Sequence, residues 1–123
     1  MRAMKNLLAA VLIGLPVAAA ADTALLMAEE PGCIWCARWN AEVGDAYEKT
    51  AEGRAAPLQR YDIDAGPPDD VDLARRVVFT PTFILVRDGQ EIDRIEGYPG
   101  EDFFWGLLNI MLEKADISLG TTG

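Results

Sequence analysis

The chain contains two cysteines, Cys33 and Cys36, and no histidine. This spacing is compatible with a redox dithiol, with an inert local disulfide, or with a two-thiolate site for a soft ion such as Cu(I). A structural zinc site needs four Cys and His ligands, and a Ser-His-Asp or Cys-His catalytic centre needs an imidazole base. The sequence therefore excludes both, and we expect no metal and no cofactor in a site built on the two sulfur atoms.

The cysteine pair is predicted to lie in the first turn of a helix, because it follows the turn-forming segment Glu29-Glu30-Pro31-Gly32. The exposed backbone N–H groups at the start of a helix stabilise a thiolate. We therefore predict that Cys33 is the attacking nucleophile and that Cys36, one turn deeper, resolves the mixed disulfide.

The two residues between the cysteines, Ile34 and Trp35, influence the direction of the reaction. A positive charge or a strong donor at these positions would stabilise the thiolate and make the disulfide form more oxidising. Ile34 has neither, and Trp35 offers one indole N–H. Ile34 and Trp35 therefore favour a reductant over a strong oxidant. We also expect Trp35 to contact the substrate, with simple shielding of the Cys36 sulfur as the alternative.

A second candidate site element is Thr80-Pro81, which directly precedes the apolar run 83–86. A cis peptide bond is accessible before proline, although trans remains the more frequent state. Such a bond would turn the backbone of Thr80 toward the dithiol and offer its N–H and C=O groups to a substrate strand.

The pattern of apolar residues predicts an α/β fold with a mixed sheet of about four strands and about three helices. A parallel crossover comes first, and an antiparallel hairpin follows at Asp88-Gly89. Gly53 is expected just beyond the end of the first helix. The predicted strands cover 23–28, 56–64, 83–86 and 91–96, and the predicted helices cover 33–50, 71–77 and 101–115.

The domain boundaries follow from a basic start and an apolar run typical of a secretory leader. We expect residues 1–21 to be a signal peptide cleaved near Ala20 or Ala21, residues 22–119 to form one domain, and residues 120–123 to be a flexible tail. The run is short for a membrane-spanning helix. The net charge of −9 argues against nucleic acid. It is typical of a solvated acidic surface, and it would also favour partners that are neutral or basic at their contact site.

With these elements in place, the chain resembles the thioredoxin superfamily from about Thr23 to Leu119. The resemblance implies a thioredoxin fold, attack by Cys33, resolution by Cys36, and pairing of the Thr80 backbone with the partner chain. The chain departs from the family at Met27, where many members keep a buried carboxylate. The residues that carry the resemblance are the dithiol, Tyr61-Asp-Ile-Asp64, Thr80-Pro81-Thr82, Asp88-Gly89 and Gly97.

The leader and the run from Gly97 to Trp105 look like the periplasmic thioredoxins encoded with bacterial sulfur-oxidation (Sox) systems. This resemblance implies a periplasmic reductase that frees the cysteine of a Sox carrier protein from disulfides or adducts. The partners would be proteins with disulfides or modified cysteines, together with an upstream membrane thiol donor. We expect a monomer.

Three other functions remain open on the sequence. A Cu(I) carrier would bind the ion through both thiolates, but the terminal helix predicted over 101–115 argues against the usual element order of such carriers. An inert disulfide would close a short loop and gain little chain entropy. A disulfide oxidase or isomerase would use the same dithiol at a different potential.

Overall fold

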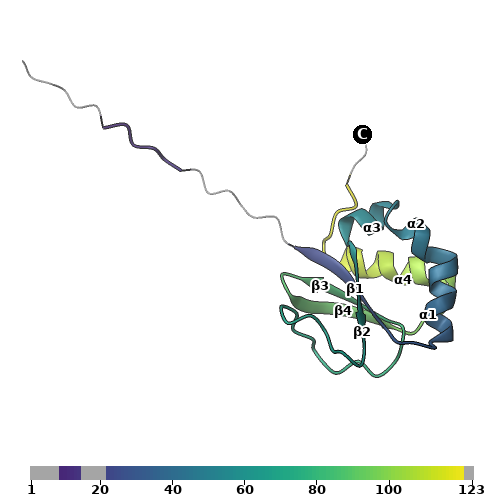
Figure 1. Ribbon diagram of the computed structural model, residues 1–123. Coiled ribbons are helices and arrows are strands. Elements are labelled where there is room, and N and C mark those ends of the chain that lie inside the picture. Colours follow the sequence, from purple (N-terminus) through teal and green to yellow (C-terminus); the bar gives the residue numbers. More distant parts are fainter. Residues whose placement is uncertain (1–8, 15–21, 121–123) are drawn as a thin grey trace, which may run out of the picture.

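The computed structural model describes residues 9–14 and 22–120 of the chain. Residues 23–114 contain a mixed sheet with helices packed on one side (Figure 1). The predicted cleavage sites near Ala20 and Ala21 and the last three residues lie outside the described residues. Within the described part, no helix is long and apolar enough to cross a membrane. The elements are β1 (Thr23–Glu29), α1 (Ile34–Trp39), a π-helical segment (Asn40–Gly44), α2 (Asp45–Tyr47), α3 (Ala51–Ala55), β2 (Leu58–Asp62), β3 (Thr82–Arg87), β4 (Gln90–Glu96) and α4 (Glu101–Lys114).

The four strands lie in the order β2-β1-β3-β4. β1 pairs in parallel with β2 and antiparallel with β3, and β3 and β4 form an antiparallel hairpin. The hairpin turns at Asp88 and Gly89, whose φ angles of 51° and 79° match the turn signal. The predicted mixed sheet of four strands, with its parallel crossover and its antiparallel hairpin, is confirmed.

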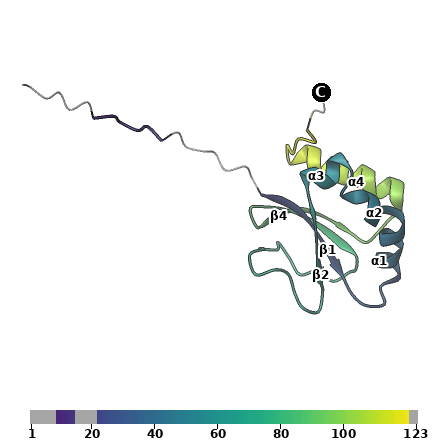
Figure 2. The same ribbon diagram turned by 45° about the horizontal axis from the view of Figure 1, so that its top comes forward.

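The two faces of the sheet are covered differently. Side chains alternate along a strand, so β1 sends Leu25 and Met27 to the face that α1 to α4 cover, and Leu26 to the other face. The second face is covered by the connection between β2 and β3, from which Val77 is buried against Leu26. Figures 1 and 2 show the helices on one side of the sheet and this connection on the other.

The helix predicted over 33–50 is present as α1, the π-helical segment and α2, which follow one another without a break. Its buried side chains are Cys36, Trp39, Val43 and Tyr47, at the spacing of three and four residues that the sequence predicted. This stripe packs on the central strands and thereby fixes the start of α1 at the end of β1.

Gly53 does not follow the end of this helix as predicted, because it lies inside the separate helix α3. Thr50 begins α3, and its Oγ1 accepts a hydrogen bond from the Gly53 N–H at 3.0 Å. A Cβ on Gly53 would lie 1.9 Å from the Tyr47 carbonyl oxygen. The glycine therefore permits close packing of two backbones.

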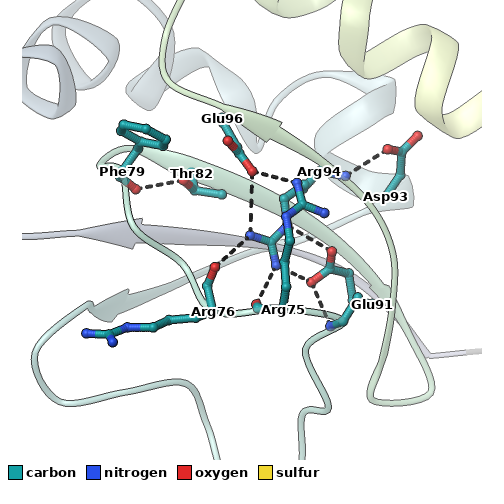
Figure 3. Close-up of polar contacts among 9 residues, drawn as sticks. Arg75, Arg76, Phe79, Thr82, Glu91, Asp93, Arg94 and Glu96 are labelled. Carbon is teal, nitrogen blue, oxygen red and sulfur yellow. Dashed lines mark hydrogen bonds and ion pairs between the residues drawn. The ribbon is translucent and has the colours of Figure 1, made fainter.

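The helix predicted over 71–77 is wrong, because this segment has no helical residue. Asp72 instead forms a bridge with Gln90. The carbonyl groups of Arg75 and Arg76 accept hydrogen bonds from the Arg94 side chain at 2.8 and 3.5 Å (Figure 3). Contacts to β4 therefore replace the local bonds of a helix, and a local sequence pattern does not contain them.

The last helix, α4, begins after Gly100 and ends one residue before the predicted limit. Four of its apolar side chains are buried, whereas Leu107 is exposed. Of its three consecutive aromatics, Phe104 is buried and Phe103 is exposed. Trp105 is half-buried and stacks on Tyr47 with ring centroids 6.0 Å apart. The four buried residues are Phe104, Leu108, Met111 and Leu112.

Candidate functional site: a disulfide at a helix start

Cys33 caps the start of α1. Its backbone is extended, and its Sγ accepts a hydrogen bond from the Cys36 N–H at 3.1 Å. The first turn of α1 contains no acidic residue. The sulfur of Cys33 therefore lies at the positive end of the helix dipole, and no carboxylate in that turn would repel a thiolate at Cys33.

The two cysteines are joined in a disulfide, with their Cα atoms 5.2 Å apart. Cys33 is half-buried, whereas Cys36 is only 4% exposed and belongs to the core on the helical face. A partner molecule can therefore approach the sulfur of Cys33 more easily than that of Cys36.

Ile34 and Trp35 both project into solvent, with exposed fractions of 75% and 49%. The guanidinium of Arg38 lies 5.5 Å from the centroid of the Trp35 ring and forms an ion pair of 3.2 Å with Glu42. A cation over an indole ring is attracted by its negative face. Arg38 therefore favours one orientation of the exposed Trp35 ring, while its own charge is shared with Glu42.

The peptide bond between Thr80 and Pro81 is cis. Pro81 is buried, and its carbonyl accepts a hydrogen bond from the Gly97 N–H at 2.7 Å. Among the hydrogen bonds of the described residues, none uses the N–H or C=O of Thr80. These two groups are therefore available to pair with an extended chain.

Glu30 links the cysteine pair to the cis-proline loop. Its carbonyl accepts a hydrogen bond from the Cys33 N–H at 3.3 Å. Its carboxylate accepts one from the Thr80 hydroxyl at 2.8 Å. Two segments that are far apart in the sequence therefore meet at one residue, and Glu30 joins the site, although the sequence indicated it only as part of a turn.

A second set of polar contacts lies behind Cys36. Met27 is fully buried, as a thioether in the place where many family members keep a carboxylate. The Arg60 guanidinium donates to Glu29 and to Asn40, both at 2.8 Å, and lies 5.6 Å from the Trp39 ring centroid. Arg60 is exposed, as expected for a surface residue, but its three contacts give it a fixed place.

An open hollow flanks the disulfide on this side. It gives solvent a path to the edge of the cysteine pair and lies between the two carboxylates at the end of β1. The residues that line it are Glu29, Glu30, Gly32, Cys33, Ile34, Cys36, Ala37 and Asn40.

Two exposed apolar residues near the cis-proline were not predicted as part of the site. Val78 and Phe79 are 64% and 57% exposed, directly before Thr80. The Phe79 carbonyl accepts a hydrogen bond from the Thr82 hydroxyl at 2.7 Å, which closes the loop around the cis bond. The sequence does contain the apolar run Val77-Val78-Phe79. Such a short run occurs in strands and helices as well as in a loop that covers a sheet face, so it does not identify these residues as part of the site.

No group of three Cys, Asp or Glu side chains among residues 9–14 and 22–120 is arranged to hold a metal ion. The chemistry that the arrangement supports is exchange at sulfur. One sulfur is accessible at a helix start and the other is buried in the core, and the free backbone edge at Thr80 is linked through Glu30 to Cys33.

Comparisons with known proteins agree with this geometry. A sequence profile for a thioredoxin-like domain matches residues 17–111. The crystal structure of the periplasmic thioredoxin SoxS from Paracoccus pantotrophus, in its reduced form, is 51% identical in sequence. That match covers 76% of this chain and 99% of that chain, with a TM-score of 0.75.

A more distant structure, the thioredoxin of Fasciola hepatica, is 19% identical and has a TM-score of 0.52. The match covers 72% of this chain and 80% of that one, and it supports the fold alone. No sequence among the curated proteins matches the chain.

Proposed function

The chain belongs to the thioredoxin-like family, and on that premise we propose that it works as a protein-disulfide reductase in the periplasm. Its thiol–disulfide oxidoreductase chemistry resides in Cys33 and Cys36. The observation that carries the proposal is the unequal exposure of the pair, with Cys33 accessible at the start of α1 and Cys36 buried behind it.

The reaction begins from the reduced protein. The Cys33 thiolate attacks one sulfur of the partner's disulfide, the other partner sulfur leaves as a thiolate and takes up a proton, and a mixed disulfide forms. Cys36 then loses its proton and attacks the Cys33 sulfur, which releases the second partner thiol. The partner gains two electrons and two protons, and the protein ends in the Cys33–Cys36 disulfide form.

The direction toward reduction is supported by the residues around the pair. Neither Ile34 nor Trp35 carries a charge, and the nearby cation of Arg38 is engaged by the Trp35 ring and by Glu42. With little extra stabilisation of the thiolate, the disulfide form is a weak oxidant. Equilibration of the pure protein with glutathione tests this: we expect a potential below that of the glutathione couple, whereas a potential well above it would indicate an oxidase.

Substrate binding is proposed at Ile34, Trp35, Thr80 and Pro81. The first two supply an exposed apolar contact beside Cys33, and the unpaired N–H and C=O of Thr80 can add a partner's extended chain as a further strand. The cis bond before Pro81 turns this edge at the end of β3, where Glu30 connects it to Cys33.

The proposed partners are proteins with disulfides or modified cysteines, among them a carrier protein of a sulfur-oxidation system. The likeness to the periplasmic thioredoxin SoxS supports this choice, as does the predicted leader over residues 1–21. Because the reaction leaves the protein oxidised, a thiol donor at the membrane must return two electrons to the pair.

The experiment that tests these roles is trapping by a single substitution. Cys36→Ser should leave partners attached to Cys33 as mixed disulfides that are released by dithiothreitol, and mass spectrometry should identify a Sox carrier among them. Cys33→Ser is the matched control and should trap none. Trapping by Cys33→Ser alone would reverse the assignment of nucleophile and resolving cysteine.

A further inference from the structure

The connection between β2 and β3 includes a segment, residues 71–80, that we call the strap. It begins at the hairpin turn, where the Asp72 N–H donates to the Gly89 carbonyl at 2.6 Å and the Glu91 N–H donates to the Asp72 carbonyl at 3.0 Å. The strap then crosses the sheet face opposite the helices and ends at Thr80, beside Glu30. Its far end is therefore part of the proposed partner-binding edge.

The middle of the strap is held by a buried ion pair on β4 (Figure 3). The side chains of Glu91 and Arg94 are each only 4% exposed. Arg94 donates to Glu91 Oε2 from Nε at 2.8 Å and to Oε1 from Nη2 at 2.5 Å. This two-point contact fixes the plane of the guanidinium.

The remaining donors and acceptors of this ion pair bind the strap backbone. Arg94 donates to the carbonyl of Arg75 at 2.8 Å and, more weakly, to that of Arg76 at 3.5 Å. Glu91 accepts a hydrogen bond from the Ala74 N–H at 3.1 Å. Backbone groups of three consecutive residues, which form no helical hydrogen bonds, therefore find their partners in two side chains.

Two further polar contacts hold the strap: the exposed Arg75 side chain pairs with Glu96 on β4 at 2.6 Å, and the Phe79 carbonyl accepts a hydrogen bond from the Thr82 hydroxyl at 2.7 Å. Val77 is buried in the small cluster beneath the strap, but Val78 and Phe79 are exposed. A buried ion pair is a weak source of net stability, since desolvation offsets most of its attraction. An apolar pair would fill the same space, but it could not bind the carbonyl of Arg75.

We propose that Glu91 and Arg94 are positioning residues, which hold the strap so that the Thr80 edge lies ready to pair with a partner chain. The inference rests on the proposed function, because it assumes that a protein partner binds at Thr80. Neither residue touches the cysteines, so their effect should be limited to recognition of extended protein substrates and should not reach the sulfur chemistry itself.

The test compares a protein disulfide with a small one. Glu91→Leu/Arg94→Met replaces the ion pair by apolar side chains and avoids leaving a buried charge unpaired. We expect its KM for insulin to rise about tenfold, because a displaced binding edge loses its orientation. The rate with the small disulfide 5,5′-dithiobis(2-nitrobenzoate) should stay within about twofold of the wild-type rate. The redox potential should equal that of the wild type. Arg94→Lys, which keeps a cation opposite Glu91, should recover part of the loss.

Arg87→Met is the matched control. Arg87 is also a strand arginine that donates to a backbone carbonyl, that of Ala115, but at the opposite end of β3 from the site. We expect it to leave the KM for insulin unchanged. Parallel loss of both activities in the double variant, or an equal rise in KM for Arg87→Met, would overturn the inference.

Amide hydrogen exchange separates this inference from the proposed function. If the wild-type protein does not reduce insulin, the proposed function fails, and the role of the ion pair is then decided by exchange alone. In that case, exchange is followed at the Asp72 and Gly97 N–H groups, which donate to the Gly89 and Pro81 carbonyls at the two ends of the strap. Faster exchange of these two amides in the double variant than in Arg87→Met supports the positioning role. Equal exchange overturns it.

Discussion

At the scale of single residues, the site combines an apolar contact with a fixed orientation. Trp35 is half exposed, yet its ring is held by Arg38, which is itself paired with Glu42. An orientated aromatic side chain loses little conformational freedom when a partner covers it, which is why such residues dominate binding energies at interfaces. We therefore expect Trp35 to act as an anchor for a partner that approaches Cys33.

Replacing Trp35 by alanine should lower kcat/KM for a protein disulfide roughly tenfold, equivalent to about 1.4 kcal/mol, through loss of this contact. The rate with a small aromatic disulfide should change much less. Steady-state kinetics with both substrates measure the difference. Ile110→Ala, which removes a side chain of similar exposure from α4, is the control and should affect neither rate. Equal losses with both substrates would mean that Trp35 acts on the sulfur chemistry.

The buried carboxylate of Glu91 gives the stability of the fold a dependence on pH. Burial raises the pKa of Glu91, but hydrogen bonds from Arg94 and from the Ala74 N–H, together with the charges of Arg94 and Arg75, outweigh burial and hold the pKa below its ordinary value. The stabilisation is therefore fully present above the unfolded pKa of about 4.3, and it is lost as the pH falls through the lower folded pKa.

Glu91→Gln should therefore reduce the free energy of unfolding by about 3 kcal/mol at neutral pH, since it leaves the Arg94 charge buried without its partner. The difference from wild type should shrink as the pH falls below about 4, where the wild-type carboxylate also becomes neutral. Urea unfolding at a series of pH values gives this difference directly. A difference that is constant or grows toward acid would contradict the assignment.

Some of these residues could be predicted from the sequence and others could not. Cys33, Cys36, Ile34 and Trp35 are adjacent in the chain, so their chemistry is readable from spacing and the order of elements alone. Glu30 contacts a hydroxyl 50 positions away, at Thr80. No local pattern encodes a contact between segments so far apart, and this residue of the site therefore needed the fold.

At the scale of elements, the same distinction separates the correct from the incorrect predictions. The helix that carries Cys36, Trp39 and Tyr47 was predicted because its stripe follows the helical period. The helix predicted over 71–77 is absent, because the donors and acceptors that decide the conformation of this segment lie on β4. Tertiary contacts there override a weak local preference.

Gly53 shows how one position joins two elements. A methyl group there would lie 1.9 Å from the Tyr47 carbonyl oxygen, so α3 and the end of α2 would have to separate. Gly53→Ala should therefore lower the free energy of unfolding by about 3 kcal/mol, although alanine is the better helix former. Gly106→Ala in α4 meets no atom within 4 Å and should be neutral or stabilising by up to about 1 kcal/mol. Thermal or urea unfolding compares the two, and similar effects would show that the close approach is not restrictive.

At the scale of the whole molecule, the two faces of the sheet are packed differently. The helical face holds the large aromatic cluster around Trp39, Phe83 and Phe104, whose ring centroids lie 4.8 to 5.7 Å apart. The opposite face is closed by the strap through a smaller cluster and the ion pair on β4. The cysteines are thus anchored to the well-packed side, and the proposed partner-binding edge at Thr80 to the side with the smaller apolar cluster.

The charge of the whole molecule should select among partners. The chain carries a net charge of −9, and Glu29 and Glu30 line the hollow beside Cys33. Such a field attracts basic partners and repels acidic ones, and it acts over about 30 Å at 0.01 M salt but about 3 Å at 1 M.

The reduced protein should therefore reduce a disulfide peptide flanked by lysines roughly tenfold faster, in kcat/KM, than the same peptide flanked by glutamates at low salt. The ratio should approach one at high salt, while a peptide flanked by glutamines should show little dependence on salt. A preference for lysine that persists at 1 M salt would instead point to direct contacts with individual carboxylates, and no preference at low salt would contradict steering by the net charge.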